Sequence, residues 1–310
     1  MHLRRRQERP RSRTFVVLPR RLRILPAVLL LAAVWLADVA GAPQSFLWKA
    51  TSRNGGVVYL VGSVHLLSQD YYPLDPALDA AFKDSTLLVE EVDMDEMLSR
   101  EAQLQMLTRG MLPAGQTLDS VASPATLALV DKTVAGLGLP LAPLRQFKPW
   151  MLALTLLGLE WQRAGFDPGL GIDRHFFDQA KSAGKPIQGL ETLAYQLSRF
   201  DEMPMAEQDR FLAESLKELD TEMASVRTLA DAWKAGDAPA VEGIVLEDLR
   251  TEPQLYQRLL VERNRNWFPK IEALFTRPGR ALVVVGAAHL IGADGLLAML
   301  RAGGYTVEQL

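Results

Sequence analysis

The sequence predicts an α/β fold in which a mixed, mostly parallel central sheet is built from both ends of the chain, with a large helical insertion between them. Two continuous apolar runs, residues 57–66 and 281–290, predict buried strands. Such runs are typical of parallel strands that are covered on both faces. Each run ends in Gly-x-x-His followed by Leu, so we expect the two ends of the chain to share one sheet.

The first elements follow the order strand, helix, strand. Asn54-Gly55 is a tight-turn signal, which predicts a hairpin between residues 46–48 and residues 57–61. Asp75-Pro76 predicts the start of a short helix, with Asp as the cap and Pro at the first helical position. Residues 86–93 predict a second buried strand that ends in acidic residues. This order is typical of the beginning of a parallel sheet.

The middle of the chain predicts helices. Prolines punctuate a mostly helical region over residues 96–184. Residues 206–234 carry apolar side chains at spacings of three and four, which indicate one amphipathic helix that packs on other helices. A further helix is expected over residues 253–275.

Short strands are expected around this insertion. Residues 185–190 predict a strand with Glu191 at its carboxyl end. A helix over residues 292–302 and a strand near 305–307 close the chain. The predicted α/β core therefore covers about 45–95, 185–192 and 280–310, and the helical lobe covers about 96–184 and 193–277.

Residues 1–42 predict a basic arm followed by a signal peptide or an N-terminal anchor. Nine arginines precede residue 24, and the apolar residues 24–40 lead to Ala40-Gly41-Ala42, which fits an export signal. Asp38 and Pro43 make the cleavage site a poor one, and the 17 apolar residues are at the short end for a membrane span. Both alternatives place the remainder outside the cytoplasm, in the periplasm or anchored to the outer face of the inner membrane.

Composition excludes several classes of site. The chain has no cysteine, so disulfides, zinc-thiolate sites and cysteine nucleophiles are absent. Without residues 1–40, 25 basic and 35 acidic side chains remain, a net charge of −10. An acidic body argues against nucleic acid as a partner, because phosphates need a basic surface.

Polar residues follow several predicted strands. His65 and His289 follow the two apolar runs, Glu90 and Glu91 end the next strand, and Glu191 follows the short one. We expect them to converge, because ligands bind beyond the carboxyl ends of parallel strands. Two histidines and one carboxylate with an open position form a catalytic metal arrangement, and a further carboxylate can act as general base. Alternation sends Glu90 and Glu91 to opposite faces, so only one is expected in the site.

These residues also have structural interpretations. Acids at a strand end commonly cap the following helix. His175 lies in a helical setting, which favours a packing or surface role. Arg263 could bind a substrate carboxylate through two hydrogen bonds, or it could form an ion pair with a neighbouring acid, which is the commoner arrangement.

Several ordered motifs resemble the TraB/GumN family, which is related to the Tiki proteases and more distantly to the erythromycin-esterase-like and ChaN-like proteins. The resemblance covers residues 45–310. It rests on Phe46-Leu47-Trp48, Val61-Gly62-Ser63-Val64-His65, Leu88-Val89-Glu90-Glu91-Val92-Asp93, Gly189-Leu190-Glu191-Thr192, Glu262-Arg263-Asn264 and Gly286-Ala287-Ala288-His289-Leu290-Ile291-Gly292.

By analogy with the Tiki proteins, the resemblance implies a metal-dependent peptidase. The family pattern of Glu, an apolar residue and Asp favours Glu91 over Glu90, because Glu91-Val92-Asp93 fits it. The metal ligands are then expected to be His65, Glu91 and His289, with Mn, Co or Zn as the divalent ion. The expected catalytic glutamates are Glu91 and Glu191, the latter as base or further ligand, and the expected substrate-binding residues are Arg263 and Asn264.

The leading hypothesis is therefore an exported metal-dependent hydrolase of the peptidase class, with a peptide or protein as substrate. A non-catalytic periplasmic protein that binds a metal, haem or a peptide is the alternative, and the ChaN-like relationship motivates it. A third hypothesis is an accessory factor in surface-polysaccharide synthesis. Fold-level analogy does not prove catalysis, so turnover has to separate an enzyme from a binder. The inner membrane is a further expected partner if residues 1–42 are retained.

Overall fold

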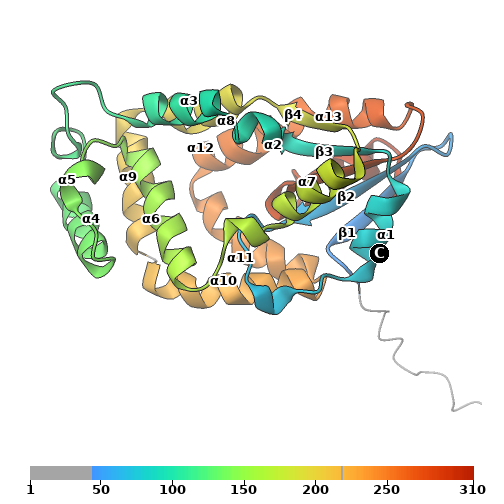
Figure 1. The fold of residues 1–310 in the computed structure, drawn as a ribbon, viewed down its shortest axis with the longest axis horizontal. Helices are drawn as coiled ribbons and strands as arrows, with labels where there is room; N and C mark the ends of the chain where they lie inside the picture. The colour runs from blue at the N-terminus through green and yellow to red at the C-terminus, as the bar shows by residue number, and fades with distance from the viewer. Residues whose placement is uncertain (1–43, 218) are drawn as a thin grey trace, which may run out of the picture. The chain divides into compact units, whose positions relative to one another are not determined.

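The computed structural model describes residues 44–217 and 219–310, and these contain a six-stranded sheet in the order β4-β3-β5-β2-β1-β6 (Figure 1). The strands are β1 (Leu47–Thr51), β2 (Val57–Ser63), β3 (Leu87–Val92), β4 (Ile187–Glu191), β5 (Ala281–Gly286) and β6 (Thr306–Gln309). Strands β4, β3, β5 and β2 run parallel, whereas β1 pairs antiparallel with β2 and with β6. The predicted α/β fold with a mixed, mostly parallel sheet is confirmed.

The two ends of the chain meet at β2 and β5, which are direct parallel neighbours. Their register runs from Val58 opposite Ala281 to Ser63 opposite Gly286. Every residue of β5, and all of β2 except its first, is buried. Apolar side chains on both faces require cover on both faces, which helices provide. This pairing brings the two Gly-x-x-His motifs side by side.

Strands β1 and β2 form the predicted hairpin. Its turn contains Gly55, whose φ of 83° lies in the left-handed region that glycine adopts without strain. The hairpin places β1 between β2 and β6, so the last strand of the chain closes the edge next to the first.

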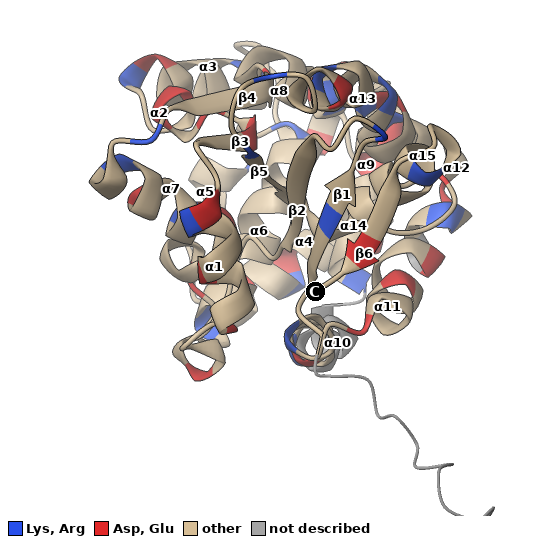
Figure 2. Ribbon diagram, turned by 90° about the vertical axis from the view of Figure 1, so that its right-hand side faces the viewer, with Lys and Arg blue, Asp and Glu red and all other residues tan. Residues whose placement is uncertain are grey.

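Helices cover both faces of the sheet. Helices α1 (Pro76–Asp84) and α7 (Ile172–Ala183) lie on one side, where the Phe82 and Phe176 rings are 5.8 Å apart. Helices α13 (Glu262–Leu274) and α15 (Leu296–Ala302) lie on the other side (Figure 2). One continuous core contains the buried residues of the sheet and of both layers.

A helical lobe lies at the end of the molecule away from the sheet, around α4 (Pro124–Gly136), α6 (Pro149–Arg163) and α9 (Met205–Lys217) (Figure 1). It has a small core of its own, formed by Leu118, Val130, Val134, Leu152, Ala153, Leu156, Leu212 and Leu216. The remaining helices are α2 (Met94–Met97), α3 (Arg100–Gly110), α5 (Leu141–Leu144), α8 (Leu193–Asp201), α10 (Leu219–Lys234), α11 (Ala238–Thr251), α12 (Pro253–Tyr256) and α14 (Ala287–Leu290), with 3-10 turns η1 (Gln69–Tyr71), η2 (Leu118–Ser120) and η3 (Pro168–Leu170).

Three helical predictions differ from the structure. The region 206–234 contains two helices, α9 and α10, because its apolar side chains belong to different cores: Leu212 packs in the lobe and Trp233 in the main core. The region 253–275 contains a π-helical turn, η4 (Gln257–Val261), between α12 and α13. The helix expected from residue 292 begins at Leu296, because Gly292 has a left-handed φ of 78°.

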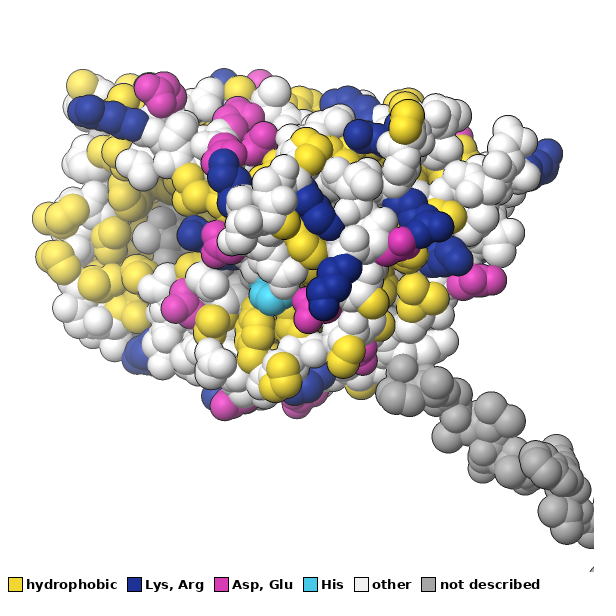
Figure 3. All heavy atoms as spheres, turned by 45° about the vertical axis from the view of Figure 1, so that its right-hand side comes forward, with side chains coloured by type: hydrophobic (Ala, Val, Ile, Leu, Met, Phe, Trp, Pro, Cys, Tyr) yellow, Lys and Arg dark blue, Asp and Glu magenta, His cyan; other side chains and the backbone are white. Residues whose placement is uncertain are grey.

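Acidic and basic side chains are interspersed on the face seen in Figure 3, and hydrophobic side chains gather at the end that carries the helical lobe. Among the described residues, none of the helices has the length and apolar character needed to cross a bilayer. The predicted basic arm and signal peptide or anchor, residues 1–42, lie outside the described residues.

Candidate functional site

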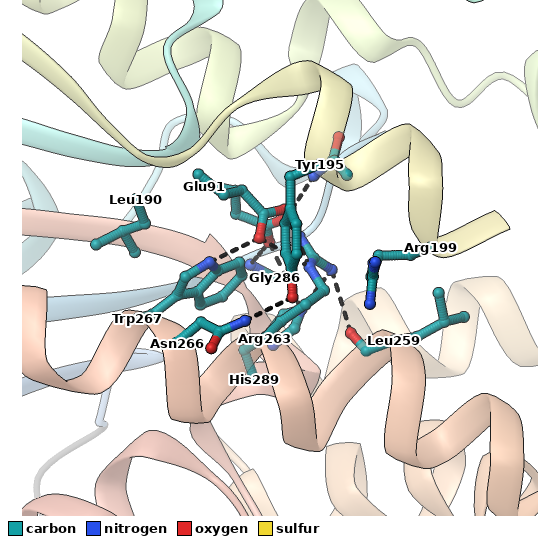
Figure 4. A network of polar contacts seen from close by, with 12 residues as sticks. Glu91, Leu190, Tyr195, Arg199, Leu259, Arg263, Asn266, Trp267, Gly286 and His289 are labelled. Atoms are coloured by element: carbon teal, nitrogen blue, oxygen red, sulfur yellow. Dashed lines mark hydrogen bonds and ion pairs between the residues drawn. The ribbon is translucent and has the colours of Figure 1, made fainter. Parts of the chain in front are cut away.

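The carboxyl ends of the four parallel strands bring the predicted site residues together. His65 follows β2, Glu91 lies near the end of β3, and Glu191 is the last residue of β4. His289 lies in the single turn of α14 that follows β5. Arg263 reaches this edge from α13, and Figure 4 shows Glu91, Trp267 and His289 around it.

Arg263 is the centre of the network. Its side chain is only 9% exposed, and Nη2 donates hydrogen bonds to Glu91 Oε2 at 2.5 Å and to Glu191 Oε1 at 2.7 Å. Nη1 donates to His289 Nε2 at 3.0 Å. Trp267 Nε1 donates to the second oxygen of Glu191 at 2.7 Å. One buried guanidinium therefore hydrogen-bonds to two carboxylates and a histidine ring, which the planar fork of arginine allows.

The backbone helps to place Arg263 as well. The π-helical turn η4 ends just before α13 and contains Leu259, whose carbonyl accepts a hydrogen bond from Arg263 Nη1 at 3.3 Å. Such turns widen a helix by one residue and frequently occur at functional sites. The turn explains how a side chain from this helix reaches the strand ends.

The hydrogen bonds of His289 define its protonation state. Arginine has no acceptor, so Nε2 of His289 must accept from Arg263, and the ring proton is therefore on Nδ1. Nδ1 lies 2.7 Å from Asn264 Oδ1, and the amide of Asn264 donates to the carbonyl oxygens of His289 and Asp294. Burial and the positive charge of Arg263 lower the pKa of His289 to about 3. His289 is thus a neutral imidazole with its Nε2 lone pair directed into the cluster.

The two glutamates on Arg263 have opposite pKa shifts. Burial would raise the pKa of Glu91, but the charge of Arg263, the nearby histidines and the backbone N–H of Gly286 outweigh it and hold the pKa well below its usual range. Burial raises the pKa of Glu191, and the neighbouring charge of Glu91 adds to the rise. Arg263 therefore holds down the pKa of Glu91 more effectively than that of Glu191.

His65 has a carboxylate partner of its own. Nδ1 lies 2.8 Å from Asp173 Oδ2, in the first turn of α7. The loop is held there because Ile172 donates its backbone N–H to Val64, and because Gly171 has no side chain to collide with the carbonyl of His65. The charge of Asp173 raises the pKa of His65 to about 9, against the opposing effect of burial. The imidazole is 58% exposed at the side chain, and its Nε2 faces the cluster.

The two motif glycines are required for different reasons. A Cβ on Gly62 would lie 2.4 Å from the ring of Phe46, so this glycine lets β2 pack against an aromatic side chain. A Cβ on Gly286 would lie 3.2 Å from Glu91 Oε1, 3.4 Å from His65 Nε2 and 3.6 Å from His289 Cδ2. Gly286 therefore marks a point that all three predicted metal ligands surround.

A cavity of about 520 Å³ lies beside this point. It is lined by His65, Leu66, Glu90, Glu91, Val92, Met94, Met97, Leu98, Pro168, Gly169, Asp173, Arg174 and Gln196. Glu191, Arg263 and His289 do not line it. Glu90 and Glu91 both line this cavity, because side chains from both faces of β3 reach it at the end of the strand. Their hydrogen bonds differ, as strand alternation predicts: Glu90 accepts from Met94, and Glu91 accepts from Arg263.

Sequence patterns locate most residues of the cluster but not all of the residues around it. Asp173 and Gln196, which donates to Glu91 at 3.1 Å, carry no spacing signal because they come from helices distant in sequence. Arg263 and Asn264, predicted to bind substrate, are buried and hold the glutamates and His289. His175 lies apart from the cluster, against Gln179 and the ring of Tyr72.

The donor chemistry of the cluster suits a divalent metal. His65 and His289 each present one ring nitrogen while the other is held by Asp173 or Asn264, the support that metal-ligating histidines usually have. Among the described residues, no group of three His, Asp or Glu side chains is arranged closely enough to hold a metal ion. His289 Nε2 lies 4.0 Å from Glu91 Oε1. A cation held by these two groups would replace their hydrogen bonds to Arg263.

Fold and site together define a class: a mixed α/β protein with paired histidines and glutamates at the carboxyl edge of its sheet. The TraB/PrgY/gumN family model matches residues 46–309, and the chain belongs to this family. It is 28% identical over 246 residues to "Uncharacterized protein YbaP" of Escherichia coli (strain K12). The matched region covers 78% of this chain and 87% of that protein. The Shigella flexneri protein of that name has the same identity and the same coverage. No solved structure matches the chain significantly.

Proposed function

We propose that this chain is an exported metal-dependent hydrolase of the peptidase class, with His65, Glu91 and His289 as the metal-binding residues. The convergence of these three side chains on Gly286 is the observation that carries the proposal. The resemblance to the Tiki proteases supports a peptide bond as the target, and the basic and apolar N-terminal segment supports export.

The surrounding residues would prepare the site. Asp173 and Asn264 hold the two imidazoles in one orientation each. On metal binding, His65 would give up its Nε2 proton, and Glu91 and His289 would exchange their hydrogen bonds with Arg263 for the metal. A bound divalent ion would supply Lewis-acid activation of water and of the scissile carbonyl. Arg263 keeps Glu91 ionised and therefore able to act as a ligand.

Glu191 has a role behind the site in this proposal. Both of its oxygens are bonded to Arg263 and one of them to Trp267, and it does not line the cavity. It orients the guanidinium, and a role as general base would require that these contacts open. Of the two glutamates that contact Arg263, only Glu91 lines the cavity.

Metal content tests the proposal most directly. The full chain, purified without chelator and incubated in turn with Mn, Co and Zn, should bind about one ion per chain, measured by mass spectrometry. The double variant His65→Ala/His289→Ala should lose that ion and any hydrolysis of a peptide library. His175→Ala is the matched control, because it removes an imidazole away from the cluster. Equal metal content and hydrolysis in all three proteins would contradict the proposal.

A non-catalytic binding protein is the second candidate. Arg263 hydrogen-bonds to Glu91, Glu191 and His289 at once. A ligand held in the cavity without turnover would leave these hydrogen bonds in place. The same experiment separates the two, since a binder would retain a peptide in the cavity without cleaving it at any metal concentration.

A further inference from the structure

We propose that the cavity beside the cluster is a subsite for a cationic side chain with an apolar stem, that of lysine or arginine, and that Glu90 recognises its positive charge. Naming the ligand as part of a peptide rests on the proposed function, whereas recognition of an alkylammonium group does not. The inference is drawn from the hydrogen bonding of Glu90, the ion pairs around it and the apolar wall of the cavity.

Glu90 is a buried carboxyl group with one unused oxygen. The residue is 3% exposed and lines the cavity. Oε2 accepts the backbone N–H of Met94 at 3.3 Å, whereas Oε1 has no hydrogen-bond partner among the described residues. Leaving a buried polar atom unpaired is costly, so a cavity ligand that reaches this oxygen would complete its hydrogen bonding.

Glu90 also lacks a counter-ion, unlike the other charged groups of the cavity wall. His65 pairs with Asp173, and Arg174 pairs with Asp178. Glu91 pairs with Arg263. Among the described residues, no ion pair includes Glu90.

Burial disfavours the ionised form of Glu90, and the carboxylates of Asp93, Asp95 and Asp173 add to that effect. An incoming cation would offset both effects and favour the ionised carboxylate.

The remainder of the wall suits a chain of methylene groups. Met94, Met97 and Leu98 line the cavity, and Met97 and Leu98 are 37% and 51% exposed, which is unusual for such side chains. Lysine and arginine bury their stems along apolar surfaces and place the charge at the end. Because His65 and Glu91 line the same cavity, the recognised residue would lie next to the bond that is cleaved.

Binding of a small amine tests the subsite without catalysis. The full chain, labelled with 13C at the methionine methyl groups, would be titrated with n-hexylamine and with 1-hexanol, and the signals of Met94 and Met97 followed by NMR. We expect the amine to bind at least about tenfold more tightly than the alcohol, because only the amine carries the charge. Glu90→Gln should abolish this difference.

The variant is suited to the test because it keeps the shape of the side chain, and its amide oxygen can still accept the N–H of Met94. Glu101→Gln, the same change at an exposed position of α3, is the matched control and should leave the difference intact. Equal binding of amine and alcohol, or an amine preference that survives in Glu90→Gln, would overturn the proposal.

A peptide series separates this inference from the proposed hydrolase. Peptides with Lys, norleucine or Glu at one position would be offered to the wild type and to Glu90→Gln. Cleavage that prefers Lys in the wild type alone would support both proposals. Cleavage with equal preference would overturn the subsite and leave the hydrolase standing. Amine binding without cleavage of any peptide would support the subsite and overturn the hydrolase.

Discussion

Replacing Arg263 by methionine should destabilise the fold strongly, because it leaves Glu91 and Glu191 buried without their cation. The three side chains are 9%, 11% and 4% exposed, so water cannot take over the role of the guanidinium. Removing one partner of such a buried pair costs about 3–5 kcal/mol. For a domain of this size, this corresponds to a decrease in Tm of roughly 6–20 °C.

The effect of Arg263→Met should depend on pH in a defined direction. The folded state holds the pKa of Glu91 below its ordinary value of 4.5, so the stabilisation is present above that value and is lost as the pH falls through the folded-state pKa. The difference in unfolding free energy between wild type and variant should therefore be largest near neutral pH. It should decrease on acidification because, without Arg263, burial raises the pKa of Glu91 in the variant, so protonation relieves the variant at a pH where the wild type is still ionised.

Urea unfolding followed by tryptophan fluorescence at about pH 7.5 and pH 5 measures this difference. Arg280→Met is the matched control, since Arg280 pairs with Asp84 at the surface, where both side chains are more than a third exposed. Exposed pairs contribute about 0–1 kcal/mol. If Arg263→Met costs no more than Arg280→Met, the cluster is not held by charge compensation and the reasoning fails.

Three further predictions concern the surroundings of the cluster. Gly286→Ala should weaken metal binding by at least about tenfold, because the new methyl group meets Glu91 and His65; a metal titration that matches the wild type would refute the convergence. Asp173→Asn should lower the pKa of His65 from about 9 toward 6.5, which NMR titration of the ring protons detects. Burial raises the pKa of Glu90 to about 8, so the wild type should lose stability as the pH rises from about 4.5 through 8. Glu90→Gln should remove this loss and be more stable by about 1–3 kcal/mol near pH 8, with no such gain near pH 5 in urea unfolding.

The residues near the strand ends show how far a sequence pattern reaches. Apolar runs and the turn at Gly55 depend on local chemistry, so the strands, the hairpin and the positions of His65 and His289 could be predicted. Asp173 is 108 residues from His65 and has no pattern of its own. Its contact depends on how the loop after β2 docks onto α7, which only the packed fold defines.

Arg263 shows the same limit on the other side of the cluster. The sequence left its ion pair and its substrate contact as alternatives, because a long side chain can reach many partners from one helix. The π-helical turn before α13 and the burial of Glu91 and Glu191 decided for the ion pair. Local propensities do not encode such a turn, since it depends on packing against the sheet.

The sequence by itself determined the α/β class, the contribution of both chain ends to one mostly parallel sheet, and the placement of two histidines and three glutamates at strand ends. These follow from hydrophobic periodicity and from the rule that parallel strands end at one edge. The tertiary structure alone decided that the pKa of Glu91 is lowered and that of Glu191 raised, that His289 stays neutral, and that Glu90 lines the cavity without a counter-ion among the described residues. Those properties depend on burial and on distances between side chains from different elements, which a linear pattern does not contain.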